Sequence, residues 1–213
     1  AYSVFGLSKK AKLNWKKSVK INPRNHEAYF NLGRIFSKTK GYEEAIKFYQ
    51  KAIEQKHDYL KVFYNLGTIY SILNKTNEAI EYYQKVLALN PNHMLAHFAL
   101  GNVLLKSNKP ESALFEYKKA IKLNPDHIPS IVNLGHTLFI LGQSDQAKNT
   151  YKTILLKQPN IPEVHKSLGL IYSQKKENPD KAIHHFQEYL RLSPSQSDAS
   201  QIKSMIQALN TPN

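Results

Sequence analysis

A Leu-Gly pair that returns at a constant interval constrains this chain more than any other feature. The glycines stand 34 residues apart, each directly after a leucine, at Gly33, Gly67, Gly101, Gly135 and Gly169. After each of the first four, an alanine follows twelve residues later and an aromatic residue four residues after that alanine. A period of this length is typical of stacked helical hairpins, each of which packs only against its neighbours. The sequence therefore predicts a repeat protein.

Each period predicts two antiparallel helices, because its apolar residues fall on one face of a first helix and one face of a second. We expect Gly67 and Ala79, which have almost no side chain, to let the two backbones approach. That contact would offset the roughly 1 kcal/mol that a glycine costs inside a helix. The aromatic position is expected to wedge between one repeat and the next. It is occupied by Trp15, Tyr49, Tyr83, Tyr117, Tyr151 and Phe186.

The period also divides the chain. Tyr2–Ala11 aligns with Tyr70–Ala79, so residues 1–25 are expected to be a partial repeat that opens in the last turn of a first helix. The full repeats are expected at residues 26–59, 60–93, 94–127, 128–161 and 162–196, the last with one extra residue in the turn around Lys175–Asp180. Residues 197–213 predict a capping helix and tail, with Asp198 near the N-cap and apolar positions at Ile202, Met205, Ile206 and Leu209.

The order Leu-Gly, alanine, aromatic residue and proline within 34 residues resembles the tetratricopeptide repeat. The resemblance covers nearly the whole chain. It implies an all-α fold, a right-handed superhelical solenoid of antiparallel helix hairpins with a capping helix at its C-terminal end. It also implies that the first helices line a concave groove in which a partner binds.

Carried over position by position, the resemblance gives a candidate peptide-binding groove. Its residues are Phe30, Asn31, Arg34, Tyr64, Asn65, Phe98, Asn102, Asn133 and His136. An asparagine amide both donates and accepts hydrogen bonds, so a row of asparagines can pair with the backbone of an extended peptide. The row is similar to the asparagine ladder in the repeat region of protein O-linked N-acetylglucosamine transferases, and it is broken at Ala99. The alternative is that asparagine is simply abundant in this chain and tolerated on helices that face water.

The sequence gives less support to other classes of ligand. The clamp with which some members of the family grip the acidic tail of a chaperone is matched only at Asn65. The formal net charge of +14 suggests nucleic acid, but most lysines fall on second helices rather than in a continuous groove-facing stripe. We therefore do not expect nucleic-acid binding. No stretch approaches 18 consecutive apolar residues, so no membrane insertion is predicted.

The sequence predicts no enzyme, no cofactor and no metal site. The chain has no cysteine, which excludes disulfides and thiol catalysis and is compatible with a reducing or an oxidising compartment. His93 and His97 stand four residues apart, but His97 falls on a buried position, where a structural role is expected.

The leading hypothesis is a protein-interaction scaffold that binds an extended peptide segment of a partner protein in its groove. Two alternatives stay open: a non-catalytic substrate-binding arm of a larger enzyme such as a glycosyltransferase, and an assembly scaffold. In the second alternative the chain would self-associate through its convex face, or through an apolar face around Val4, Leu7 and Ala11 at its N-terminal end.

Overall fold

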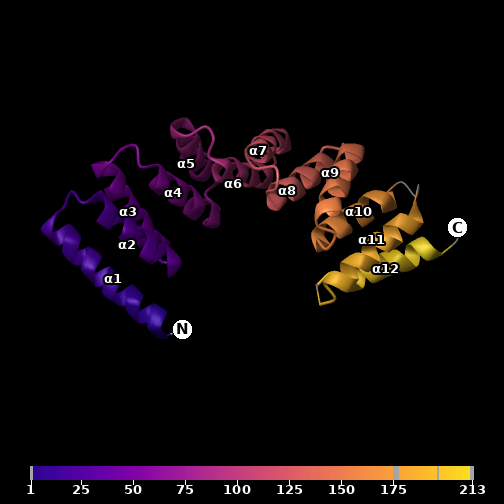
Figure 1. The fold of residues 1–213 in the computed structure, drawn as a ribbon, viewed down its shortest axis with the longest axis horizontal. Coiled ribbons are helices and arrows are strands. Elements are labelled where there is room, and N and C mark those ends of the chain that lie inside the picture. Colours follow the sequence, from indigo (N-terminus) through magenta and orange to yellow (C-terminus); the bar gives the residue numbers. More distant parts are fainter. Residues whose placement is uncertain (1, 175–177, 196, 212–213) are drawn as a thin grey trace. The chain divides into compact units, whose positions relative to one another are not determined.

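The computed structural model describes residues 2–174, 178–195 and 197–211, with side chains described from Lys10 onwards. This part of the chain folds into twelve helices without a strand (Figure 1). In chain order the helices are α1 (Tyr2–Ile21), α2 (His26–Lys38), α3 (Tyr42–Gln55), α4 (Leu60–Ile72), α5 (Thr76–Leu89), α6 (Met94–Lys106), α7 (Pro110–Leu123), α8 (Ile128–Ile140), α9 (Ser144–Lys157), α10 (Pro162–Gln174), α11 (Pro179–Leu192) and α12 (Ala199–Asn210).

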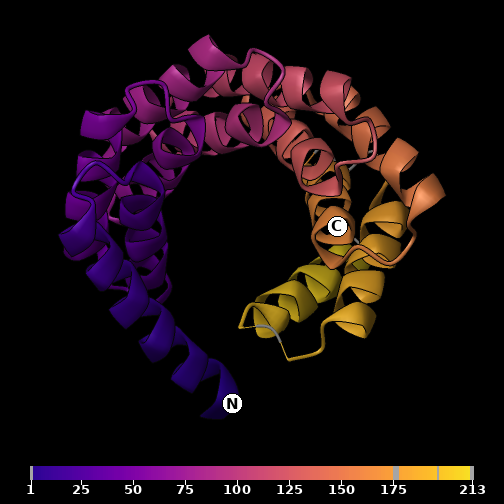
Figure 2. The same ribbon diagram turned by 60° about the vertical axis from the view of Figure 1, so that its left-hand side comes forward.

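The helices form two compact units. Unit 1 is Ala1–Val103 and unit 2 is Leu104–Asn213, so the boundary falls inside α6. Within unit 1, α2 packs against α3 and α4 against α5; within unit 2, α8 packs against α9 and α10 against α11. Figure 1 and Figure 2 show these neighbours as antiparallel pairs. The prediction of an all-α solenoid of helix hairpins is confirmed.

The turns of the four hairpins from α2–α3 to α8–α9 share one backbone conformation. Each contains a residue with positive φ at the same position of the repeat, namely Lys40, Asn74, Asn108 and Gly142. The amide of the next residue then donates to a carbonyl five residues earlier, as in Gly41 N to Phe36 O (2.9 Å) and Gln143 N to Leu138 O (2.9 Å). This is the Schellman arrangement, which satisfies carbonyls at the end of the first helix.

Gly142 offers a clean test of that turn. Its φ is +73°, and a Cβ placed on it would meet nothing within 4 Å, so only backbone conformation opposes a side chain there. We expect Gly142→Ala to lower the free energy of unfolding by about 1 kcal/mol. Gly142→Asn should cost less, because asparagine tolerates this region, as Asn74 and Asn108 do at the equivalent positions. Urea denaturation followed by circular dichroism measures both; equal stability of the alanine variant and the wild type would contradict the expectation.

The repeated glycines make room for aromatic rings rather than for alanines. A Cβ on Gly33 would lie 2.5 Å from Cε1 of Tyr49, and one on Gly135 would lie 2.5 Å from Cε1 of Tyr151. For Gly67 the three nearest atoms also belong to a ring, that of Tyr83. The sequence predicts that the glycine makes room for a close contact, but it does not predict that an aromatic ring fills this room. The aromatic ring packs directly against the glycine.

The aromatic rings join neighbouring repeats. Tyr49 is fully buried in an apolar cluster that contains Val62 and Leu66 of the following first helix. Tyr151 likewise shares a cluster with residues of α10. Trp15, at the equivalent position of α1, is only partly buried. The rings are therefore core residues of the stack, as the sequence predicts.

The N-terminal partial repeat differs from its prediction. The sequence predicts that the chain opens in the last turn of a first helix, whereas α1 continues without a break from Tyr2 to Ile21. The segment contains a single glycine and no proline before residue 22. One glycine costs a helix only about 1 kcal/mol, so the flanking residues carry the helix through it. The side chains of Val4 and Leu7, on which the self-association hypothesis rests, lie outside the described residues; Ala11 is half-buried.

At the C-terminal end of unit 2, α12 covers the last repeat. Ile202 is 2% exposed and shares a cluster with Phe186 and Tyr189 of α11. Met205, Ile206 and Leu209 pack against the same cluster. This is the capping role that the sequence predicts for this helix. Four residues connect α10 to α11, whereas three connect the two helices of each earlier hairpin; residues 175–177 of this connection lie outside the described residues.

Candidate functional site

The predicted aromatic positions of unit 1 are half-buried and held by other rings. The Phe30 ring centroid lies 6.1 Å from that of Tyr49 and 5.3 Å from that of Tyr59. The Tyr64 ring repeats the arrangement, 5.8 Å from Tyr83 and 5.4 Å from His93. Each ring thus has a fixed orientation and exposes only part of its surface on α2 or α4. Such a surface gives apolar contact at little cost in side-chain entropy.

The asparagines of unit 1 are anchored to their own helices. Asn31 Nδ2 donates to Glu27 O (2.9 Å), and Asn65 Nδ2 donates to Lys61 O (2.6 Å). A carboxamide has two N–H donors and an acceptor oxygen, so this bond uses one donor and fixes the direction of the rest. The two side chains can therefore still hydrogen-bond a ligand. Their preorganisation reduces the entropy that binding costs.

Unit 1 contains three further candidate residues, Arg34, Phe98 and Asn102. Arg34 is exposed, and its guanidinium carbon lies 5.7 Å from the Phe30 ring centroid, within the range of a cation–π contact. The repeat-equivalent Thr68 accepts a hydrogen bond from the hydroxyl of Tyr83 (3.3 Å). Phe98 and Asn102 lie half-buried on the part of α6 that belongs to unit 1.

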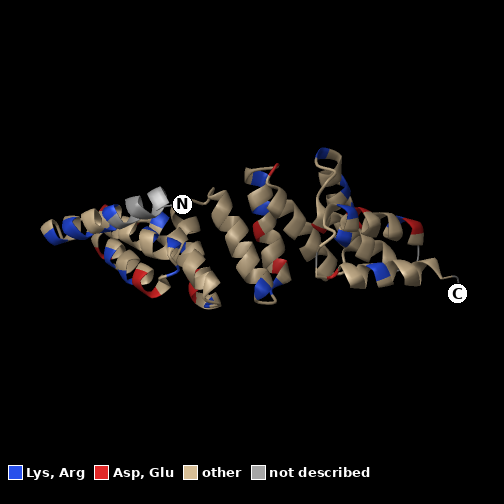
Figure 3. Cartoon of the chain, turned by 90° about the horizontal axis from the view of Figure 1, so that it is seen from below, with Lys and Arg blue, Asp and Glu red and all other residues tan. Residues whose placement is uncertain are grey.

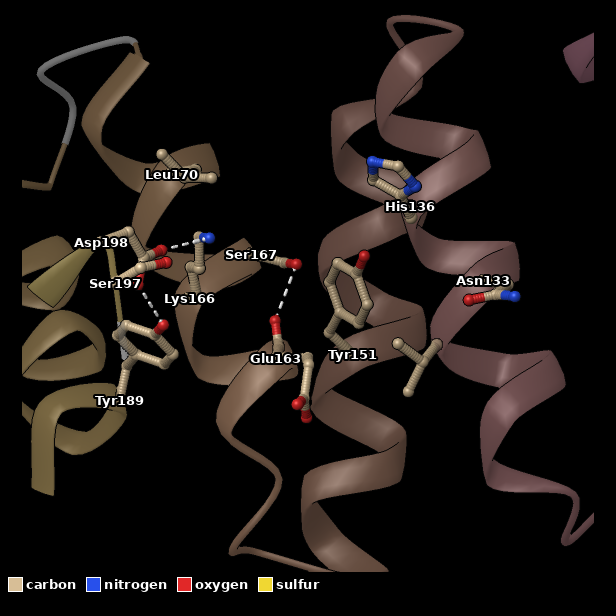
Figure 4. A pocket seen from close by; sticks show the side chains of 11 residues that line it. Asn133, His136, Tyr151, Glu163, Lys166, Ser167, Leu170, Tyr189, Ser197 and Asp198 are labelled. Atoms are coloured by element: carbon tan, nitrogen blue, oxygen red, sulfur yellow. Dashed lines mark hydrogen bonds and ion pairs between the residues drawn. The ribbon is translucent and has the colours of Figure 1, made fainter. Parts of the chain in front are cut away.

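Unit 2 contains a pocket of about 650 Å³ between the equivalent faces of α8 and α10 (Figure 4). It brings together the two candidates of this unit, Asn133 and His136. The sequence reasoning did not assign the other lining residues to the site, although Val132, Lys166, Ser167 and Leu170 occupy positions equivalent to its chosen residues. The complete lining is Val132, Asn133 and His136 of α8, Tyr151 of α9, Glu163, Lys166, Ser167 and Leu170 of α10, Tyr189 of α11, and Ser197 and Asp198 before α12.

Tyr151 brings a buried polar group to this pocket. The residue has no exposed surface, and its hydroxyl meets no full hydrogen-bond geometry with a described residue. Burial raises the pKa of Tyr151, and the nearby Ser167 hydroxyl partly offsets the rise. Figure 4 shows the hydroxyl between His136 of α8 and Ser167 of α10. Ser167 donates its own hydrogen bond to Glu163 O (2.8 Å). A buried hydroxyl without a well-formed hydrogen bond costs about 1–3 kcal/mol.

One wall of the pocket is held by a carboxylate. Asp198 Oδ2 pairs with Lys166 Nζ at 2.5 Å, and Asp198 Oδ1 accepts from the Tyr189 hydroxyl at 2.5 Å. The bonds from Lys166 and Tyr189 lower the pKa of Asp198, and desolvation together with the bond to Asp198 raises the pKa of Tyr189 to about 12. Asp198 therefore ties the start of α12 to α10 and α11 instead of capping its own helix with its side chain.

Charge is distributed unevenly along the described part of the chain. Helix α1 carries six lysines and no acidic residue, whereas most of the later helices carry residues of both signs (Figure 3). A continuous basic surface is what binds a phosphate backbone, and the lysines of α1 are not among the predicted groove residues. None of the described helices combines the length and apolar character needed to cross a bilayer.

The histidines form contacts of a structural kind. His97 and His165, at equivalent repeat positions, each place Nε2 2.8 Å from a proline carbonyl, Pro91 O and Pro159 O respectively. His165 Nδ1 lies 3.1 Å from Nδ1 of His185, so one neutral ring donates to the other. Within the described residues, no group of three or more histidine, aspartate or glutamate side chains is placed to hold a metal ion.

The histidine pair predicts a pH dependence of stability. Burial lowers the pKa of His185 from 6.5 to about 4, and the nearby His165 adds to the effect. The unfolded chain then binds more protons between these values, so stability is fully present above about pH 6.5 and falls as the pH drops towards 4. After allowance for partial exposure we expect a loss of about 1–2 kcal/mol. His185→Gln should flatten this part of the profile, and the exposed His184→Gln should not; equal profiles for both variants would contradict the assignment.

Comparison with known proteins identifies the repeats. Models described as tetratricopeptide repeat match residues 26–59 and 60–93, residues 82–115 and residues 104–171, which together exceed half of the chain. Cell division cycle protein 27 homolog A of Arabidopsis thaliana is 50% identical over 54 residues, which are 25% of this chain and 7% of that protein. The match therefore spans only a small part of that relative.

Solved structures share the fold. YrrB, a tetratricopeptide repeat protein with an unusual peptide-binding site, superposes with a TM-score of 0.76 at 24% identity, over 89% of this chain and 97% of its own. The pilF protein of Pseudomonas aeruginosa gives a TM-score of 0.78 at 20% identity, over 95% and 92% of the two chains. MamA gives 0.73 at 22% identity, over 81% and 94%. At these identities the likeness establishes the fold alone. The spacing, the helix hairpins and the matched models agree: the chain belongs to the tetratricopeptide repeat family.

Proposed function

We propose that this chain is a protein-interaction module that binds an extended segment of a partner protein on the exposed faces of its first helices. The pocket between α8 and α10 carries the proposal. It is large enough for several side chains and is lined by both apolar and polar groups. Concave sites of mixed lining with a few directed polar groups are typical of ligand binding.

Unit 1 offers a related surface by itself. The oriented rings of Phe30 and Tyr64 lie next to Asn31 and Asn65, whose anchored amides keep groups able to pair with a peptide backbone. Main-chain hydrogen bonds would supply affinity for an extended segment, and the aromatic surface would select apolar side chains. The likeness to YrrB, which has a peptide-binding site, agrees with this proposal.

The proposal is tested by capture of a partner and titration of variants. The immobilised chain should retain a partner from a lysate of its source, and a peptide from that partner should reproduce the binding. We expect Tyr64→Ala to weaken the affinity by about 2 kcal/mol and Asn133→Ala by about 1 kcal/mol. Lys118→Ala, on the exposed side of α7, is the control and should leave the affinity unchanged. Loss of binding with Lys118→Ala, but not with the other two variants, would move the site to the second helices.

A further inference from the structure

The pocket of unit 2 carries one charge that the chain itself does not neutralise. Its charged side chains are Glu163, Lys166 and Asp198. Lys166 and Asp198 form an ion pair with each other, whereas Glu163 forms none with any described residue. Glu163 is exposed on the first turn of α10 and stands among the residues that line the pocket (Figure 4). The pocket is therefore locally acidic in a chain whose formal net charge is +14.

We propose that this pocket takes an arginine side chain of the bound segment, an inference that rests on the proposed function. Glu163 provides the carboxylate for the guanidinium. The hydroxyl oxygen of Ser167 can accept a further N–H group, because Ser167 uses only its proton in the bond to Glu163 O. A guanidinium carries five donors in a fixed plane, which suits several acceptors better than the single point charge of lysine.

The walls of the pocket fit the rest of that side chain. Val132 of α8 and Leu170 of α10 line it, and apolar groups of this kind pack well against the methylene stem of arginine. An acidic side chain would fit poorly. It would face Glu163, while Lys166, the one cationic lysine or arginine among the lining residues, is already held by Asp198. An unpaired carboxylate brought near Glu163 is repelled, which adds discrimination against acidic segments.

Capped tripeptides are suitable probes: acetyl-Gly-Arg-Gly-amide, its citrulline analogue, which has the same shape without the charge, and its glutamate analogue. Each is titrated into the isotope-labelled full chain while amide resonances are followed by NMR. The arginine probe should shift resonances of α8 and α10 around the pocket. The citrulline probe should bind about tenfold more weakly, the amount expected for a charge-assisted hydrogen bond, and the glutamate probe more weakly still.

Matched variants assign the effect to the pocket. Glu163→Gln should weaken the arginine probe about tenfold and remove its advantage over citrulline. Glu27→Gln is the control, because Glu27 stands at the equivalent repeat position, exposed on the first turn of α2, and lies outside the pocket. Ser167→Ala should weaken the arginine probe about threefold to tenfold, since it removes an acceptor oxygen from the pocket.

Three results would overturn the inference: equal affinity of Glu163→Gln and wild type for the arginine probe, equal binding of the glutamate and arginine probes, or shifts confined to residues away from the pocket. These results are separable from failure of the proposed function. A captured partner that binds wild type and Glu163→Gln equally would keep the interaction module and remove the arginine pocket. A captured partner that binds Tyr64→Ala and Asn133→Ala as tightly as wild type would count against the module itself.

Discussion

Replacing Gly33 by leucine is expected to lower the free energy of unfolding of unit 1 by about 3 kcal/mol or more, near the upper end of the cost of overpacking. Even the first carbon of a side chain would lie 2.5 Å from the fully buried Tyr49 ring. That ring also lies beside Val62 and Leu66 of the next repeat, so it has no free direction in which to move. The measurement is urea denaturation monitored by circular dichroism.

A graded control separates this clash from a general effect of substitution. Gly67→Ala would place its Cβ 2.9 Å from the Tyr83 ring, whereas Gly33→Ala would place it 2.5 Å from the Tyr49 ring. The first alanine should therefore cost less than the second, although alanine favours the helix over glycine by about 1 kcal/mol in both. A pair of alanine variants that are both as stable as wild type would show that the rings do not rest on the glycines.

Phe186→Ala is expected to lower the free energy of unfolding of unit 2 by about 3–5 kcal/mol, the cost of deleting a buried aromatic side chain. Phe186 has no exposed surface, rests against Gly169 and shares its cluster with Ile202 of the capping helix. Loss of the ring opens a cavity under α12, so the start of that helix should also loosen. Thermal and urea unfolding of the variant measure the cost.

Leu156→Ala is the matched apolar control. Leu156 lies on a second helix like Phe186, but 88% of its surface is exposed. Its truncation should change stability by less than about 0.5 kcal/mol. If Leu156→Ala and Phe186→Ala proved equally destabilising, the assignment of core and surface in unit 2 would be wrong.

The repeat period explains why the fold could be predicted from the sequence. Gly33, Gly67 and their equivalents stand at a constant spacing, so the same helix boundaries are predicted independently in every repeat. A helix that is ambiguous in one repeat can therefore be assigned from its neighbours. Prediction failed where the period had no support. At α1 a single glycine was too weak to break the helix. The ring that packs against each glycine was also not predicted, because sequence spacing gives the face of a helix but not which large side chain crosses it.

The candidate site was predictable only in part. Repeat positions on the first helices place Asn133 and His136 in the lining of one pocket. Tyr151 was interpreted as core, and it is fully buried, but it also stands among the residues that line the pocket. The same tyrosine recurs at Tyr49, Tyr83 and Tyr117, so the sequence did not distinguish this position. The contribution of Asp198 could not be foreseen, because it depends on how the chain folds back before α12.

We propose that the first helices of the hairpins bind the partner, whereas the second helices form the core and the opposite surface. Hydrogen–deuterium exchange of the whole chain, with and without a captured partner segment, tests this most directly. We predict increased protection on α2, α4, α8 and α10, strongest around Asn133 and Glu163, with little change on α3, α5, α7 and α9. Protection confined to the second helices would contradict binding on the first helices.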